Sequence, residues 1–498
     1  MEKVPPEVLS SILRYLDVRT SYHRDTPNPT WPKYVTVCSK WQHQIERFSF
    51  NEVLLTRQRI GYVRIIELGI RLPSYDEEAR TRLKNPDEKR RNNEVFTRTV
   101  EEFFSFFEAL SDCAPDNRVL KITAISPSDI WYRPCYDRTR RMRRSYLTKD
   151  ICEVRFQHSY LELLHAPNWP IGVFSSFQIL DQYYRSLRWR LISPIAYCQI
   201  ASQLQTLTNI DWCLSDREKR DLALRAYLRD SFAGGLELLP DSLEIVKLQY
   251  TYPPPNNHDF APARVSAGID KLSVALRALC QRVKSADVEA SVTSDFFWPS
   301  IATCMEPGAL EPRQEWPHLQ PLSLLAAAAD PNGNWLCDRH CKYGAVDAAG
   351  VQEEQDEEEK DEEDEEEDED YLRNGEPGTP ADEDRRDNQF RGSPNERLIS
   401  AWNIGIARAA REMPLLRDLR VIIPGVGPRP YRGGYRVTYA VADRRLKIQS
   451  TPVQVMDDAL RDAWKEAAMT HGMLDGDVET ELIESIQPSS MWRRHGQT

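Results

Sequence analysis

Residues 337–341 bring together the side chains most suited to binding a metal ion. Cys337, His340 and Cys341 offer two thiols and an imidazole, which are ligands that Zn²⁺ prefers. A structural zinc site usually needs four ligands in two pairs, and the nearest other cysteine, Cys304, lies well upstream. We therefore expect no metal site here, but two free thiols at the edge of an unstructured segment.

Motifs of known enzyme chemistry are absent from the sequence. The chain has no GxxxxGK[ST] phosphate loop, no GxSxG nucleophile turn and no HExxH zinc motif, and its 9 histidines are scattered. These observations favour a protein without catalytic residues, metal ligands or a cofactor.

An arginine-rich stretch at residues 133–144 is flanked by aromatic residues, among them Trp131 and Tyr136. Basic residues interleaved with aromatics can follow a nucleic-acid backbone, and a short basic run can also act as a nuclear import signal. The third alternative is a solvated loop whose arginines pack on the rings. We favour the solvated loop, and nucleic acid is an unlikely partner on this reading.

Charge is concentrated in one segment. Residues 352–370 hold 16 Asp or Glu and one Lys, so this segment has a net charge of −15. The whole chain has a net charge of −12, which leaves +3 for the remainder. The remainder thus lacks the strongly basic character of many nucleic-acid-binding proteins. A segment this polar cannot bury enough apolar surface to offset its ordering entropy, which predicts a disordered acidic insertion over residues 330–392.

Length and composition indicate a globular protein of several parts. With 498 residues, of which 41% are hydrophobic, the chain can form a substantial core and about three domains. No secretory signal and no apolar run of the roughly 20 residues that span a membrane is visible. Ten scattered cysteines then favour reduced thiols, in the cytoplasm or nucleus.

Strand-like and helix-like patterns alternate over residues 51–329. Apolar runs typical of strands centre near Ile66, Leu120, Phe177, Ile210, Val246, Glu289, Leu322 and Leu419. Helices are expected to begin at Ser193-Pro194 and to span Asp216–Leu228 and Ala267–Val283. The spacings from Phe177 to Leu322 are 33, 36, 43 and 33 residues, which predicts an irregular leucine-rich-like α/β solenoid. A doubly wound α/β domain is the alternative, but no phosphate loop supports it.

Residues 393–475 have the pattern of a last repeat with a capping helix. Capping boxes at Ser393–Glu396 and Thr451–Gln454 predict two helix starts, and residues 435–441 and 446–449 have the pattern of a hairpin. The second helix is expected to end at Gly472, and residues 476–498 to form a flexible tail. The fold class predicted for the whole chain is α+β or α/β, with helices at its N-terminus.

The first fifty residues contain two short amphipathic helices. Prolines at positions 5 and 6 favour a helix start, after which apolar residues recur at three- and four-residue steps from Val8 to Leu16. A second apolar pattern runs from Tyr34 to Ile45. Both helices have more apolar surface than so small a unit can bury, which favours contact with a partner. An internal helical hairpin is the alternative.

These residues resemble an F-box. The segment Val4-Pro5-Pro6-Glu7-Val8-Leu9, with Ile12, Leu13 and Leu16, is similar to the first half of the family pattern; Val37-Cys38-Ser39-Lys40-Trp41, with Ile45, is similar to the second. The chain departs from the pattern at Val4, where leucine is usual, and in a long proline-rich loop between the halves.

The resemblance implies a function in ubiquitin conjugation. F-box domains (residues 1–50 here) bind the Skp-type adaptor of an SCF-type cullin-RING ligase, and the rest of the chain recruits the target protein, whose identity is unknown. Adaptor-binding residues would be Pro5, Pro6, Leu9, Ile12, Leu13, Leu16, Val37, Cys38, Trp41 and Ile45. The remainder resembles the divergent leucine-rich-like tails of fungal F-box proteins, with cues at Ile125–Asp129, Arg188–Arg217 and Trp464. A ligase-independent scaffold or a nuclear nucleic-acid-associated protein remains the alternative.

Deletion of residues 352–386 is predicted to leave thermal stability nearly unchanged, because a polar loop contributes little core and long surface loops are tolerated. Differential scanning calorimetry of the intact and deleted chains checks this. A melting temperature lowered by about ten degrees would contradict the prediction, since it corresponds to roughly 2–3 kcal/mol or more for a domain of this size.

Overall fold

A computed structural model describes the chain from residue 63 to residue 483, with gaps. The described residues are 63–76, 78–108, 118–129, 159–165, 168–179, 190–216, 218, 221–255, 258, 260–299, 315–339, 391–425, 434–450, 456–473 and 479–483. The F-box-like residues 4–45, the arginine-rich stretch and the acidic run lie outside them.

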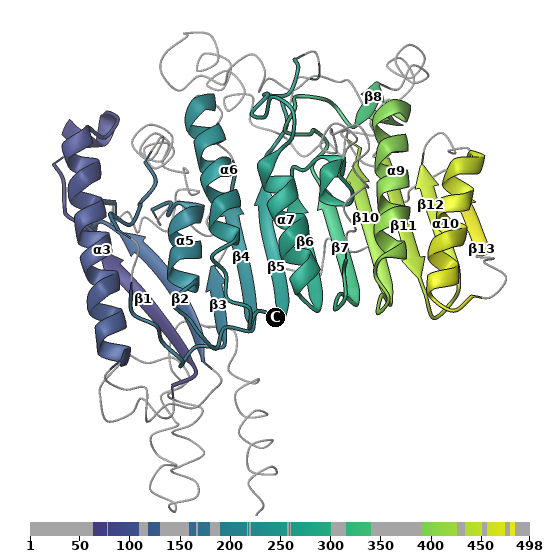
Figure 1. The fold of residues 1–498 in the computed structure, drawn as a ribbon. Helices are drawn as coiled ribbons and strands as arrows, with labels where there is room; N and C mark the ends of the chain where they lie inside the picture. Colours follow the sequence, from purple (N-terminus) through teal and green to yellow (C-terminus); the bar gives the residue numbers. More distant parts are fainter. Residues whose placement is uncertain are drawn as a thin grey trace, which may run out of the picture.

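Eleven described strands form one sheet, in which each strand neighbours the next strand of the same sheet along the chain (Figure 1). In order they are β1 (Ile65–Arg71), β2 (Val119–Ile125), β3 (Ser176–Ile179), β4 (Asn209–Ser215), β5 (Ile245–Thr251), β6 (Ser285–Ala290), β7 (Pro321–Ala326), β10 (Asp418–Pro424), β11 (Gly434–Ala440), β12 (Arg445–Ser450) and β13 (Glu479–Ile483). All neighbours are parallel except β10–β11 and β11–β12, which are antiparallel. Strands β8 (Cys337–Arg339) and β9 (Arg391–Pro394) form a separate antiparallel pair.

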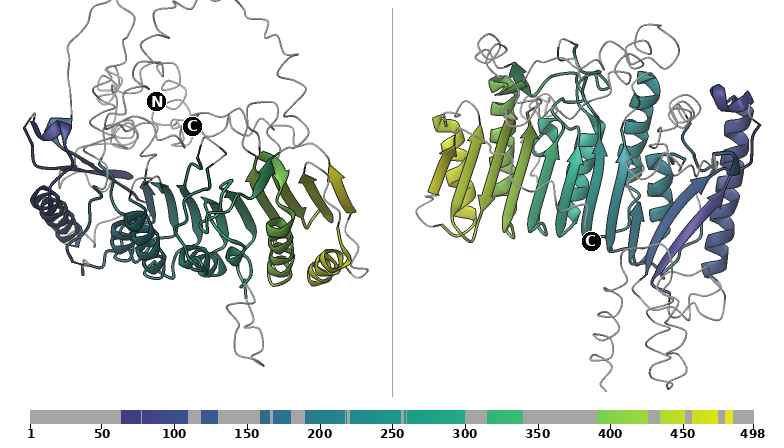
Figure 2. Two further views of the ribbon diagram at one scale, coloured as in Figure 1. Left: turned by 90° about the horizontal axis from the view of Figure 1, so that it is seen from above. Right: turned by 180° about the vertical axis from the view of Figure 1, so that it is seen from behind.

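Six described helices lie along one face of this sheet (Figure 2). They are α3 (Pro86–Glu108), α5 (Pro194–Ala201), α6 (Leu222–Leu236), α7 (Lys271–Arg282), α9 (Glu396–Arg411) and α10 (Asp458–Thr470), with short 3₁₀ turns at Glu78–Thr81, Pro127–Asp129 and Ser294–Phe296. The protein is thus of mixed α/β class with a large, mostly parallel sheet. A doubly wound domain would have helices on both faces and a reversal in strand order, and neither occurs among the described elements.

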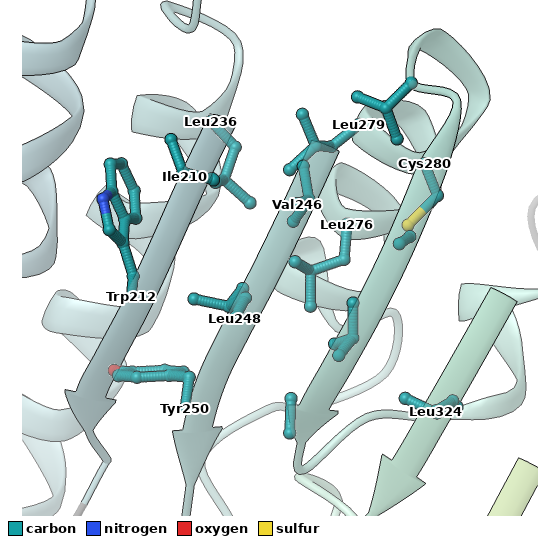
Figure 3. Close-up of a cluster of buried hydrophobic side chains, with 14 of the residues drawn as sticks. Ile210, Trp212, Leu236, Val246, Leu248, Tyr250, Leu276, Leu279, Cys280 and Leu324 are labelled. Atoms are coloured by element: carbon teal, nitrogen blue, oxygen red, sulfur yellow. The ribbon is translucent and has the colours of Figure 1, made fainter. Parts of the chain in front are cut away.

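The core lies between the sheet and these helices. Every second strand residue points toward the helices. On neighbouring strands these core side chains lie opposite each other, as Trp212 and Leu248 do (Figure 3). Leu276 and Leu279 of α7 cover the same region from the helix side. Burial of each such side chain stabilises the fold by about 1.5–3 kcal/mol. One continuous cluster runs from Val63 to Met473, so the strand–helix units share a single core.

Two glycines permit close approaches that a side chain would block. A Cβ at Gly235 of α6 would lie 2.8 Å from Ile195 and 2.9 Å from Cys198, so glycine lets α6 pack tightly against α5. Gly434 begins β11 with a φ of 128°, and a Cβ there would lie 2.5 Å from the Ile423 carbonyl oxygen. Glycine is therefore required where the chain enters the antiparallel hairpin.

All eight strand runs predicted from the sequence coincide with strands, and the hairpin and the helix starting at Ser193-Pro194 are confirmed. Four helix starts are wrong. Helix α7 begins at Lys271, not Ala267, because Asp270 caps it. Helix α6 begins at Leu222, not Asp216, because Asp221 caps it. Helix α9 is capped by Asn395, because Ser393 and Pro394 belong to β9; α10 is capped by Asp457, several residues after the capping box predicted at Thr451.

The acidic insertion and the tail also have narrower limits than the sequence predicts. Residues 330–339 and 391–392, expected to be disordered, include the β8–β9 pair and the buried Leu336 and Cys337. Within the predicted flexible tail, β13 pairs with β12. Helix α3 was missed, although Phe96, Val100, Phe103, Phe104 and Phe107 recur at helical spacing and are buried. None of the described helices is long and apolar enough to cross a lipid bilayer.

Truncation after Ala329 is predicted to leave an aggregation-prone fragment. The cut removes β10, which pairs with β7. It also removes Trp402, whose ring centre lies 5.8 Å from the ring centre of Phe297. Apolar surface then becomes exposed beside an unpaired sheet edge. Size-exclusion chromatography and thermal unfolding of residues 1–329 test this, and a soluble, cooperatively melting monomer would contradict it.

Candidate interaction surface

A buried ion-pair cluster lies where the parallel strands end. Asp216 follows β4 directly, and its two carboxylate oxygens accept bonds of 2.9 Å each from Nε and Nη2 of Arg225. Arg229, one turn further along α6, donates to the same carboxylate at 2.8 Å. All three side chains are at most 3% exposed, so helix α6 is joined to the end of β4 in the protein interior.

The same cluster continues into the next strand–helix unit. Arg229 donates to both oxygens of Asp270, at 3.2 and 3.0 Å, and to the Ser291 carbonyl oxygen at 3.0 Å. Asp270 in turn caps α7 by accepting from the backbone N–H and the hydroxyl of Ser273. One guanidinium therefore connects α6, the start of α7 and the end of β6.

Electrostatics within the cluster favour the charged arginine. Burial by itself would lower the pKa of Arg229, but the carboxylates of Asp270 and Asp216 outweigh it and hold that pKa above its ordinary value. Burial raises the pKa of the neighbouring Tyr250 hydroxyl well above its ordinary value, with Asp216 adding to the effect. The guanidinium of Arg225 stacks on Tyr252, 3.5 Å from the ring centre. The two carboxylates thus stabilise the charged form of Arg229.

A second buried pair repeats the arrangement near the N-terminal end of the sheet. Asp129, just after β2, accepts from Nε and Nη2 of Arg190 at 2.8 and 2.6 Å, and both side chains are at most 1% exposed. The Tyr75 hydroxyl donates to the same carboxylate at 2.6 Å. Carboxylates at the ends of β2 and β4 therefore have the same role, which is to hold an arginine from a later segment.

The buried carboxylates at this edge are satisfied by internal donors. After β7, Asp330 accepts from the backbone N–H groups of Asn332 and Asn334, and burial raises its pKa. Within the described ranges, no group of three or more His, Cys, Asp or Glu side chains is placed to hold a metal ion. The carboxylates of Asp129, Asp216, Asp270 and Asp330 therefore support the fold at this edge.

No described helix covers the sheet face opposite the six helices, here called the open face, and the side chains on it are mostly polar. Side chains that alternate with the core residues form rows across the strands, because the strands pair in register. The central row consists of Glu67, Lys121, Gln178, Asp211, Lys247, Asp287, Ser323, Arg420, Thr438, Lys447 and Glu481. Opposite charges follow one another along much of this row, which stabilises the sheet and gives the face a defined charge pattern.

The next row along the strands is partly apolar. The Cys213 thiol contacts the Gln249 amide oxygen at 2.8 Å, and the Gln249 amide donates to Glu289 at 3.0 Å. After Glu289 the row continues with half-buried Leu325 and Ile422, which face each other on β7 and β10. This combination of charged, polar and aliphatic side chains is suited to binding a polypeptide.

The structure bears on few of the residues singled out in the sequence. All ten predicted adaptor-binding residues lie outside the described residues. Cys337 lies in β8, fully buried, and burial raises its thiol pKa to about 12, so this residue is part of the core rather than a loop thiol. The predictions missed the buried arginine–aspartate pairs, although an Asp directly after a strand, as at Asp216, was a visible signal.

Comparison with models of known protein families found no match to this chain, and comparisons with curated proteins and with solved structures found none. The argument for function therefore depends on the chain's own residues.

Replacement of Asp216 by Ala is predicted to lower the free energy of unfolding by about 3–5 kcal/mol, because it leaves two buried guanidinium groups without their shared carboxylate. Asp230→Ala is the matched control. It removes a carboxylate from α6, the helix that carries Arg225 and Arg229, but both Asp230 and its partner Lys271 are exposed, so the expected loss is below about 1 kcal/mol. Chemical denaturation of both variants makes the comparison, and equal losses would contradict a structural role for the cluster.

Proposed function

We propose that this protein is a substrate-recognition subunit of an SCF-type cullin-RING ubiquitin ligase. The observation that carries the proposal is the two-part F-box-like motif of residues 4–45, which precedes a large α/β region. The protein would have no catalytic residues of its own and would act in the cytoplasm or nucleus.

The motif would bind a Skp-type adaptor by helix-in-groove recognition. Such recognition uses apolar side chains at i, i+3, i+4 and i+7, and Leu9, Ile12, Leu13 and Leu16 have this spacing. Trp41 and Ile45 would extend the apolar surface from the second half of the motif. Aromatic side chains often dominate the energy of such interfaces, which gives Trp41 a central part.

The α/β region would recruit the target protein. Its consecutive strand order and its helices on one face support an irregular leucine-rich-like solenoid, in which repeated units present one long surface. The open sheet face would hold the target so that its lysines reach the conjugating enzyme at high effective concentration. Binding and positioning would be the protein's whole contribution to the reaction.

A scaffold that works without a ligase is the second candidate, and the open sheet face supports it equally well, since the strands that form this face begin at Ile65. Co-purification of the full chain and of residues 51–498 with a mass-spectrometric readout distinguishes the two. A ligase subunit loses the adaptor and the cullin on truncation, whereas a scaffold retains its partners.

The double variant Leu9→Ala/Leu13→Ala is predicted to weaken adaptor binding by about 2 kcal/mol or more, at least about thirtyfold in Kd, because both side chains belong to the apolar stripe. Ser10→Ala/Ser11→Ala, on the same predicted helix but off the stripe, is the control and should bind normally. Titration of the purified adaptor checks both variants. Unchanged affinity of the leucine variant would refute the F-box assignment.

A further inference from the structure

Two arginines lie diagonally across neighbouring strands on the open sheet face. Arg420 of β10 stands opposite Thr438, and Arg436 of β11 stands opposite Ile422. Diagonal neighbours of this kind lie about 7–8 Å apart at the backbone, within reach of long side chains. Both side chains alternate with the core residues Val421 and Val437, so they point away from the helices.

Arg436 forms no ion pair with any described residue. Its Nε is buried without a hydrogen-bond partner, and burial together with the nearby Arg420 lowers its pKa. The basic residues of the following strand differ, because Arg445 and Lys447 pair with Glu479 and Glu481 of β13 at 3.4 and 3.5 Å. Among the described residues, positive charge on this part of the face is therefore left uncompensated at Arg436.

Aliphatic side chains adjoin this charge. Leu325 and Ile422 are half-buried and lie in the same row as Arg436, on β7 and β10. A partner that places a carboxylate at Arg436 and an aliphatic side chain on Ile422 would satisfy both features at once. Arginine binds carboxylates with two parallel hydrogen bonds, which gives such a contact geometric specificity.

We propose that the open face over β7, β10 and β11 binds an acidic, leucine-containing segment of a partner protein. Where the chain acts as proposed above, this segment belongs to its target; the binding itself does not depend on the adaptor.

Charge on the rest of the face favours a peptide over a nucleic acid. Asp211, Asp287 and Glu289 lie on the same face, on β4 and β6, with Lys247 between the two aspartates. A polyphosphate backbone that extended across the sheet from Arg436 would meet these carboxylates, whereas a short acidic segment contacts only the basic end.

The test measures fluorescence polarisation of a labelled glutamate- and leucine-containing peptide with the full-length chain. Arg436→Glu is expected to weaken binding at least about tenfold. Arg436→Lys is expected to weaken it less, because lysine keeps the positive charge but cannot form two parallel hydrogen bonds to one carboxylate. The substituted glutamate lies beside Arg420, so the variant is expected to fold, which circular dichroism and melting temperature verify.

Lys247→Glu is the matched control. It makes the same change in formal charge on the same face, but β5 and β11 are four strand spacings apart, about 19 Å. That distance exceeds the screening length of about 8 Å at physiological salt, so binding should change little. A lysine- and leucine-containing peptide should not bind the unaltered chain.

Four results would overturn the proposal. The first is no binding by the full-length chain, and the second is equal loss in Arg436→Glu and Lys247→Glu. The third is tighter binding of single-stranded DNA than of the peptide, with the same dependence on Arg436. The fourth is binding only after deletion of residues 352–370, which would assign the surface to the chain's own acidic run. Adaptor binding, measured separately, is expected to be unaffected by Arg436→Glu, so failure here is distinct from failure of the F-box assignment.

Discussion

Stacking of each strand–helix unit on its neighbours is the constraint on which the rest of this structure depends. A unit such as β5 with α6 exposes apolar surface on both sides, and only the adjoining units cover it. Because every described helix lies on one face, the core is a continuous layer between helices and sheet rather than a set of separate centres. Stability is then shared between neighbours, and removal of one unit exposes the next. This is the reason that the chain after Asp330 belongs to the same core as the chain before it.

Packing of apolar side chains does not by itself set the position of a helix along its strand. The buried ion pairs at the carboxyl ends of the strands fix this position. Asp216 receives two arginines from α6, and Arg229 reaches on to Asp270 at the start of α7. Buried pairs of this kind are costly to desolvate and strongly destabilising to break, so they act as geometric constraints more than as sources of stability. The pair of Asp129 and Arg190 has the same effect near the other end of the sheet.

One-sided covering of the sheet has a direct consequence for binding. The uncovered face cannot be apolar throughout without promoting aggregation, and its rows of charged and polar side chains meet that requirement. The charge pattern is nonetheless uneven, with carboxylates over β4 and β6 and, near Ile422, Arg436, which pairs with no described carboxylate. A face of this kind can select partners by charge and by a small aliphatic contact, which suits a protein whose proposed contribution is recognition.

The sequence by itself determined most of the strands of the large sheet and contains the F-box-like motif. Strand runs such as those at Val246 and Leu419 were predictable because alternation of apolar residues is a local property that tertiary contacts reinforce. Helix starts were less predictable: Ser393 and Asn395 are both good caps, and pairing of β8 with β9 decided between them. Strand β13 is too short and polar to predict, and it exists because β12 offers it a partner. Only the tertiary structure brought Arg225, Arg229 and Asp270 to one place and left Arg436 without a carboxylate partner among the described residues, because both depend on which strands become neighbours and in which register.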